Sequence, residues 1–179
     1  MKKLTNVNSI KNTYAKRILS NVIDKNPLKI FAKTPHDLKR LTDGLSRKQL
    51  WTPRGKGMWS IAQIVSHLCD AEIALSYRLR MAIAQSGSAL QAYDQDTWAA
   101  ALYYEKADCM QQVNLFSVLR VANASLLKHL SPKEWQHYGM HQERGKETVE
   151  RMVQMLAGHD INHLRQIKTI RKNLLAKHR

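Results

Sequence analysis

The sequence predicts an all-α protein built as a bundle of four helices. Four long segments place apolar side chains at the three- and four-residue intervals of an amphipathic helix, and residues that cap helices precede them. No segment alternates apolar and polar residues for long enough to predict a strand. The 179 residues are 44% hydrophobic, with only 7 glycines and 4 prolines, a composition typical of one domain that buries a core.

The composition also excludes several classes of protein. Two cysteines, Cys69 and Cys109, are too few for a disulfide scaffold in a chain of this length. Apolar runs are only a few residues long, which argues against membrane insertion. Asparagines and lysines interrupt the residues after the initial Met-Lys-Lys, so no secretory signal is expected. The sequence therefore predicts a soluble cytoplasmic protein.

The chain is expected to form one domain with a basic segment at each end. Residues 1–25 are polar with weak periodicity, and we expect an N-terminal extension that holds a short helix over 14–23. Residues 26–173 form the predicted bundle, and residues 174–179 a basic C-terminal tail.

The first helix of the bundle has two candidate starts. Asn26 and Pro27 suit the cap and first position of a helical turn. Thr34 and Asp37 resemble a capping box and are the stronger start, which predicts a helix from there to Gly44.

Three longer helices follow. Ser60 and Gln63 form a capping box for a helix over 60–85, and further caps predict helices over 108–130 and 148–173. The inward apolar side chains expected on these three helices are Ile61, Ile64, Val65, Leu68, Leu75, Leu79, Ala82 and Ile83, then Phe116, Leu119, Leu126 and Leu130, then Val149, Met152, Val153, Leu156, Ile167 and Ile170.

Two connections separate these helices. Residues 88–107 are a long connection of the kind that is often functional or holds its own short helix. Residues 139–145, bounded by glycines, predict a loop.

The net charge of +15 is concentrated near the ends of the chain. Residues 1–60 carry 14 Lys/Arg and 3 Asp/Glu, residues 61–120 carry 4 and 6, and residues 121–179 carry 11 and 5. Taken alone, an excess of this size suggests nucleic acid or an anionic membrane surface as a partner. For the C-terminal bases, a solvated face and a frayed tail are favoured over a nucleic-acid patch, because no aromatic residues lie among them on which bases could stack.

The last predicted helix carries a pair of histidines with metal-ligand spacing. His159 and His163 are four residues apart, so both imidazoles lie on one face and can reach one ion. Both fall within the apolar stripe of the helix, where unpaired polar groups are costly. A shared metal ion would satisfy them, and so would hydrogen bonds to carboxylates or water.

A third ligand would have to come from another helix. His67 is the only histidine on the predicted helix 60–85, at the edge of its apolar stripe. Glu72 lies near the centre of that stripe and needs a cation, an arginine or a proton. The arginines considered for an ion pair with this carboxylate are Arg78, Arg80 and Arg165.

The order of these motifs resembles the DinB/YfiT-like superfamily, the damage-inducible DinB-like metalloproteins. The matching blocks are Trp59-Ser-Ile-Ala-Gln-Ile-Val-Ser-His67-Leu-Cys-Asp70-Ala-Glu72, Tyr77-Arg78-Leu-Arg80, Tyr93-Asp94-Gln-Asp96-Thr-Trp98-Ala and Gly158-His159-Asp160-Ile-Asn162-His163-Leu-Arg165-Gln166-Ile167. The similarity covers about residues 26–170 and does not reach residues 1–25 or the basic tail.

The resemblance implies a fold and a site. The fold would be a four-helix bundle with a long crossover connection and up-down-down-up topology. His67, His159 and His163 would bind a divalent metal. Some relatives are S-transferases or isomerases that depend on a low-molecular-weight thiol, others are metal-dependent hydrolases, and many are homodimers.

The ligand set indicates the chemistry expected of such a site. Three neutral imidazoles leave a divalent metal with its full +2 charge and at least one open coordination position. Such a site suits the activation of water or a thiol for attack on a small-molecule substrate. Zn is the default, and nitrogen ligands also accept Ni, Fe or Mn. The side chains considered for orienting an imidazole or binding substrate are Asp70, Glu72, Asp160, Arg78 and Arg165. The alternative function is a non-catalytic basic module on a metal-stabilised bundle.

Overall fold

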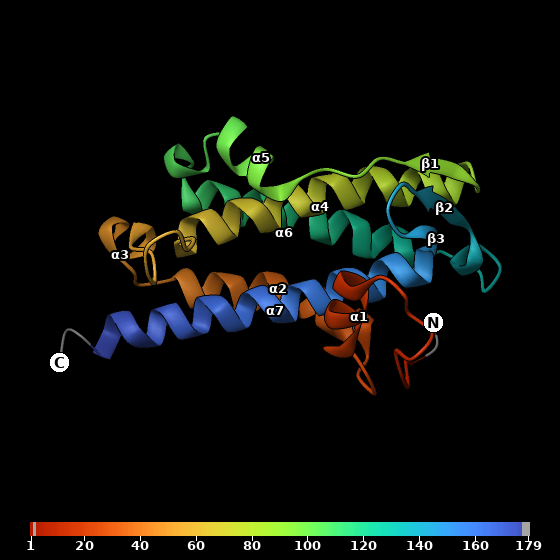
Figure 1. Cartoon of the computed structure of the whole chain (residues 1–179), viewed down its shortest axis with the longest axis horizontal. Coiled ribbons are helices and arrows are strands. Elements are labelled where there is room, and N and C mark those ends of the chain that lie inside the picture. Colours follow the sequence, from red (N-terminus) through yellow and green to blue (C-terminus); the bar gives the residue numbers. More distant parts are fainter. Residues whose placement is uncertain (2, 177–179) are drawn as a thin grey trace.

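Four long helices form the body of the protein in the computed structural model, which describes residue 1 and residues 3–176 (Figure 1). They are α2 (Pro27–Thr42), α4 (Ile61–Ala84), α6 (Cys109–Lys128) and α7 (Val149–Ala176). The short elements are α1 (Thr13–Ser20), α3 (Arg47–Trp51), α5 (Gln95–Ala101), the 3₁₀ turns η1 (Tyr104–Lys106) and η2 (Glu134–Gln136), and strands β1 (Ser88–Leu90), β2 (Tyr138–His141) and β3 (Gly145–Thr148). The predicted four-helix bundle is confirmed.

The helix directions give the expected up-down-down-up order. Figure 1 shows α4 and α6 running in one direction and α2 and α7 in the other. Helices α4 and α6 are parallel and consecutive among the four long helices. The chain between them must therefore run back along the length of the bundle before α6 begins. Residues 85–108 make this crossover, and α5 and η1 lie within it.

Helix α2 begins earlier than its stronger sequence signal predicts. The side chain of Asn26 caps it by accepting a hydrogen bond from the Lys29 N–H, and the helix continues through Pro35. Pro35 has no N–H for the carbonyl of Phe31, which instead accepts a hydrogen bond from Nη1 of Arg120 at 3.0 Å. The prediction of a start at Thr34 is therefore wrong, because a partner on α6 compensates for the proline.

The buried face of α6 also differs from the predicted one. Its buried side chains recur at heptad-like intervals and include two polar residues, Arg120 and Asn123; the apolar members are Cys109, Val113, Phe116 and Leu127. Of the predicted stripe only Phe116 is fully buried. The two polar residues obscured the true stripe and shifted the predicted face.

A small sheet closes one end of the bundle, where no strand was predicted. β1 pairs with β2 in parallel, and β2 pairs with β3 in antiparallel register, so residues 139–145 form a hairpin instead of an irregular loop. These strands have three or four residues each, too few for an alternating pattern to be recognised. Leu90 fills the space above Gly139, where a Cβ would lie 2.4 Å from its Cγ.

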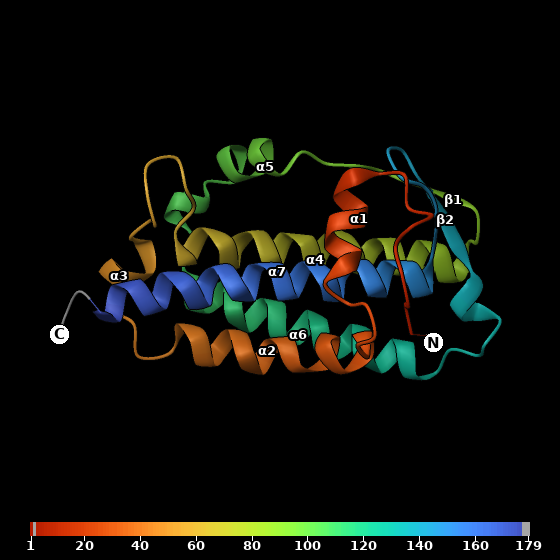
Figure 2. The same cartoon turned by 60° about the horizontal axis from the view of Figure 1, so that its bottom comes forward.

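The N-terminal segment packs onto the bundle. The short helix expected over 14–23 is α1, which lies across α7 (Figure 2). Ile18 and Leu19 are buried there in a cluster with Met155 and Ala157 of α7. Helix α7 extends to Ala176, into the predicted tail, whose residues 177–179 lie outside the described part of the chain. Across the described residues, no helix combines the length and apolar character needed to span a membrane.

Candidate metal centre

Three buried imidazoles from two helices meet inside the bundle. His67 lies in the second turn of α4, and His159 and His163 lie one turn apart on α7. Nε2 of His159 is 2.9 Å from Nε2 of His67 and 3.1 Å from Nε2 of His163. The three side chains are only 2–8% exposed. The structure thus brings together all three histidines that the sequence indicates.

The environment keeps these imidazoles neutral. Burial, with the charge of His163, lowers the pKa of His67 to about 3. Burial lowers the pKa of His163 to about 4, although its hydrogen bond to Gln166 acts in the opposite direction. The pKa of His159 lies well below its ordinary value, also mainly because of burial. All three rings therefore present lone pairs at neutral pH.

Three neutral imidazoles cannot satisfy all three of these Nε2 atoms by hydrogen bonds to one another. Nε2 of His159 faces two other Nε2 atoms but has either one proton or one lone pair. A cation that accepts all three Nε2 lone pairs resolves this, and it requires the proton of each ring on Nδ1. Nδ1 of His163 already lies 3.0 Å from the amide oxygen of Gln166, an acceptor that suits that tautomer. The residues present therefore fit a divalent metal.

The surroundings of the three histidines are partly aromatic. The Trp59 ring lies 5.2 Å from the His67 ring, measured between centroids, and shields it. Asp70, one turn after His67, accepts a hydrogen bond from the hydroxyl of Tyr104 in η1 at 2.6 Å. Burial raises the pKa of the Asp70 carboxyl. This contact fixes the crossover to α4 beside the histidines.

Glu72 and Asp160 belong to a separate buried network centred on Arg120. Nε of Arg120 donates to Oε2 of Glu72 at 2.9 Å, and Nη1 donates to Oδ2 of Asp160 at 2.6 Å. Asn123 donates to Glu72, and the Thr34 hydroxyl donates to Asp160. An arginine partner for Glu72 was expected, but Arg78, Arg80 and Arg165 were the wrong ones. The apolar periodicity of α6 gave no reason to select Arg120, although an arginine at a buried heptad position is the signal that could have identified it.

The remaining arginine candidates lie in different surroundings. Arg78 donates to the carbonyl of Gln91 and lies over the Tyr93 ring, 5.5 Å from its centroid. Arg165 donates to Asn21 at 2.8 Å on the surface between α7 and the N-terminal segment. Of the two, only Arg78 lines the cavity that contains His67 and His159.

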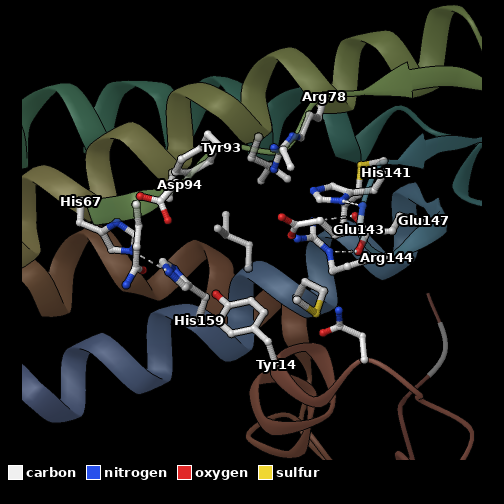
Figure 3. Close-up of a pocket in the computed structure, with 18 of the residues that line it drawn as sticks. Tyr14, His67, Arg78, Tyr93, Asp94, His141, Glu143, Arg144, Glu147 and His159 are labelled. Carbon is white, nitrogen blue, oxygen red and sulfur yellow. Dashed lines mark hydrogen bonds and ion pairs between the residues drawn. The ribbon is translucent and has the colours of Figure 1, made fainter. Parts of the chain in front are cut away.

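Two cavities adjoin the histidines. One, of about 570 Å³, is lined by His67 and His159 and extends along α4 and α7 to the sheet (Figure 3). Tyr14 of α1 and Tyr93 of the crossover contribute to its walls. The other, of about 390 Å³, is lined by His163, Gln166 and Trp59. Groups bound in either cavity could therefore approach the same three imidazoles.

Several known proteins are similar to this chain in sequence or in fold. A "putative metal-dependent hydrolase" of Oceanobacillus iheyensis is 27% identical over 154 residues, which is 86% of this chain and 89% of that one. YfiT from Bacillus subtilis, described as "a probable metal-dependent hydrolase with an unusual four-helix bundle topology", superposes with a TM-score of 0.77 at 21% identity, over 83% of this chain and 85% of that one.

A more distant similarity in fold is to a protein named as an isomerase. The mycothiol-dependent maleylpyruvate isomerase superposes with a TM-score of 0.61 at 15% identity, over 77% of this chain and 57% of that one. The family model of the DinB superfamily matches residues 30–167. Since that match includes most of the chain and all three histidines, the protein belongs to the DinB superfamily.

Proposed function

We propose that this protein is a metal-dependent enzyme that transfers a thiol to, or hydrolyses, a small-molecule substrate at His67, His159 and His163. The observation that carries the proposal is the convergence of three buried Nε2 atoms that cannot satisfy one another. The relatives named as metal-dependent hydrolases support the dependence on metal, and the structural similarity to a mycothiol-dependent isomerase supports thiol chemistry.

The histidines would hold the metal, with Zn as the default and Ni, Fe or Mn also suited to imidazole ligands. When bound, a divalent metal with three neutral ligands supplies Lewis-acid activation of water or of a low-molecular-weight thiol. Gln166 would hold His163 in the ligating tautomer through Nδ1.

The two cavities support a reaction between two partners. His67 and His159 line one cavity and His163 lines the other, so a nucleophile and a substrate could reach the site from different sides. Trp59 packs at a tilt against the His67 ring and would limit access of bulk water from that side. This arrangement suits the transfer of a group between two bound molecules.

Activity measured with and without metal tests the proposal. Full-length protein loaded with zinc would be assayed with glutathione, bacillithiol and mycothiol against an electrophilic fluorogenic acceptor, and without thiol against ester and amide substrates. We expect turnover that a chelator abolishes and added zinc restores.

The matched variants are His163→Ala and His36→Ala, since His36 is an exposed histidine on α2. Turnover is expected to be lost in the first and retained in the second. Activity that is indifferent to zinc, or equal in the two variants, would contradict the proposal.

We also propose that the enzyme acts as a homodimer. Val118 and Val121 of α6 are about two-thirds exposed, and Leu115 of the same helix is 43% exposed, which supports a contact with another chain. Light scattering coupled to size-exclusion chromatography would give twice the chain mass, and a monomer mass would contradict this.

A further inference from the structure

The end of the larger cavity remote from the histidines has polar groups of its own. Figure 3 shows His67 and His159 at one end and Arg78, His141 and Arg144 at the other. His67 and Arg78 are both on α4, eleven residues apart, which corresponds to about 16 Å along a helix. The two ends are therefore too far apart to contact the same functional group of a small ligand.

His141 directs a hydrogen-bond donor into this end. Its Nδ1 accepts a hydrogen bond from the N–H of Glu143 at 3.2 Å, so the proton of the neutral ring is on Nε2. The side chain is 3% exposed, and within the described part of the chain Nε2 has no hydrogen-bond partner. The ring lies on the cavity wall and points toward Arg78 (Figure 3). A buried donor in this position is costly unless an acceptor binds there.

Arg78 adds a positive charge beside that donor. The guanidinium is half-buried, and among the described residues it forms no ion pair; it donates to a backbone carbonyl and lies over the Tyr93 ring. Burial and the charge of Arg144 lower the pKa of Arg78, while Glu143 and Glu147 act in the opposite direction. Arg144, by contrast, is neutralised by Glu147 through two hydrogen bonds of 2.7 and 3.0 Å.

The α4 and α7 side chains between the two ends are apolar: Ala71, Leu75, Met152, Met155 and Leu156. Tyr14 and Arg17 of α1, with Tyr93 and Asp94 of the crossover, add polar groups to other parts of the wall. A ligand that spans the cavity would therefore have an apolar middle. At the sheet end, one cation without an ion pair and one neutral donor, with the carboxylate of Glu143 nearby, suit a single negative charge better than a doubly charged phosphate.

We propose that Arg78 and His141 form a subsite for a carboxylate, and that the substrate is an amphipathic monocarboxylic acid whose reactive group lies at the histidines and whose acid lies at the sheet. This inference rests on the proposed function only for the placement of the reactive group. The carboxylate subsite itself consists of groups outside the metal centre.

Binding of decanoate and of its neutral analogue decanamide tests the subsite. Both would be titrated calorimetrically into full-length, zinc-loaded protein. We expect decanoate to bind at least tenfold more tightly. Arg78→Gln should abolish this preference, and Arg78→Lys should restore part of it. The control is Arg80→Gln, since Arg80 bonds Ser76 and Asn123 outside the cavity and should leave the preference unchanged.

Variants of His141 test the second group of the subsite. His141→Gln keeps an N–H near the position of Nε2 and should keep most of the preference, whereas His141→Leu should lose it. Equal affinities for the two probes in the unaltered protein, including binding of neither, would overturn the proposal. So would a preference that survives Arg78→Gln.

A further arm separates this proposal from the proposed function. If the carboxylate bound to the zinc instead, the preference for decanoate over decanamide would be lost in His163→Ala but kept in Arg78→Gln. That pattern would overturn the proposed subsite. A preference that persists in His163→Ala and disappears in Arg78→Gln supports it, whether or not the histidines bind metal. Circular dichroism would establish that each variant is folded before its titration.

Discussion

Arg120 of α6 is the residue on which the packing beside the metal centre depends. It is 1% exposed and is the only cation paired with Glu72 and Asp160 among the described residues. Its guanidinium also lies between the Phe31 and Phe116 rings, 4.0 and 4.5 Å from their centroids. Asp160 directly follows His159, so Arg120 fixes the rotation of α7 that directs His159 toward the other histidines.

Arg120→Met is therefore expected to destabilise the protein strongly. The variant leaves two carboxylates buried without their cation, and breaking a buried pair by removing one partner costs about 3–5 kcal/mol. Urea unfolding followed by circular dichroism would measure the loss. The control is Arg47→Met, an exposed arginine at the start of α3, for which we expect a change within about 0.5 kcal/mol. Equal effects in the two variants would contradict the role given to Arg120.

The sequence made the histidines predictable at this scale, but not the arginine. His159 and His163 carry a spacing that acts within one helix. His67 was the only histidine on the other long helix, and the resemblance to the family matched it to the third ligand. Arg120 acts through contacts with α2, α4 and α7; its place in the heptad pattern of α6 could have indicated burial but not these partners. The role of His141 could not be predicted from the sequence either, because its neighbours depend on a hairpin that the sequence did not predict.

At the scale of elements, the contact between α1 and α7 places the N-terminal segment beside the larger cavity, where it forms part of the wall. Gly158 lets the two helices approach so closely that a Cβ there would lie 2.2 Å from the carbonyl oxygen of Ile18. Asn21 also donates to the Gly158 carbonyl at 3.2 Å. Since Tyr14 of α1 lines the larger cavity, this contact forms part of one wall.

Gly158→Ala should detach α1 from α7. The clash is with backbone, which cannot move aside as a side chain can, so we expect a loss of about 1–3 kcal/mol despite the better helix propensity of alanine. Hydrogen exchange should show reduced protection over residues 13–20. In the control Gly55→Ala, the added Cβ meets only the Met58 sulfur at 3.6 Å. Unchanged protection of α1 in Gly158→Ala would contradict this view of the interface.

Helix signals in the sequence were reliable where they were local. The capping box of Ser60 and Gln63 starts α4 as predicted, and Asp108 caps α6. The signals failed where a distant partner decided the outcome. Pro35 does not interrupt α2 because Arg120 satisfies the carbonyl it frees, and β1 to β3 pair across segments far apart in the chain.

For the whole molecule, the positive charge is spread unevenly over the segments that contribute to the candidate site. The excess of bases is greatest in residues 1–60. The segment 61–120, which contains His67, carries more acids than bases, and the segment 121–179, which contains His159 and His163, carries more bases than acids. Within the large cavity, cations and carboxylates both occur near Arg78. The net charge therefore does not describe the surface that a substrate would meet.

Global stability should depend on pH through His141. Burial and the charge of Arg144 lower the pKa of this imidazole from 6.5 to about 4, with Arg78 adding to the effect and Glu147 and Glu143 opposing it. Between these two values the unfolded chain binds a proton that the folded protein does not, so stability falls as the pH falls. From pH 7 to pH 5 we expect His141 to account for a loss of about 1–2 kcal/mol.

The measurement compares urea unfolding at pH 7 and pH 5 for the unaltered protein, His141→Gln and His36→Gln. The loss on acidification should be smaller in His141→Gln by about the amount given above, and unchanged in His36→Gln, whose histidine is exposed. The same loss in all three proteins would show that His141 titrates alike in the folded and unfolded chain.

The central claim is that His67, His159 and His163 hold one metal ion, and metal stoichiometry tests it most directly. Inductively coupled plasma mass spectrometry of full-length protein exchanged into zinc would give about one zinc per chain, falling to near zero in folded His67→Ala and His163→Ala and staying at one in His36→Ala. Unaltered protein without stoichiometric metal, or histidine variants that retain it, would contradict the claim.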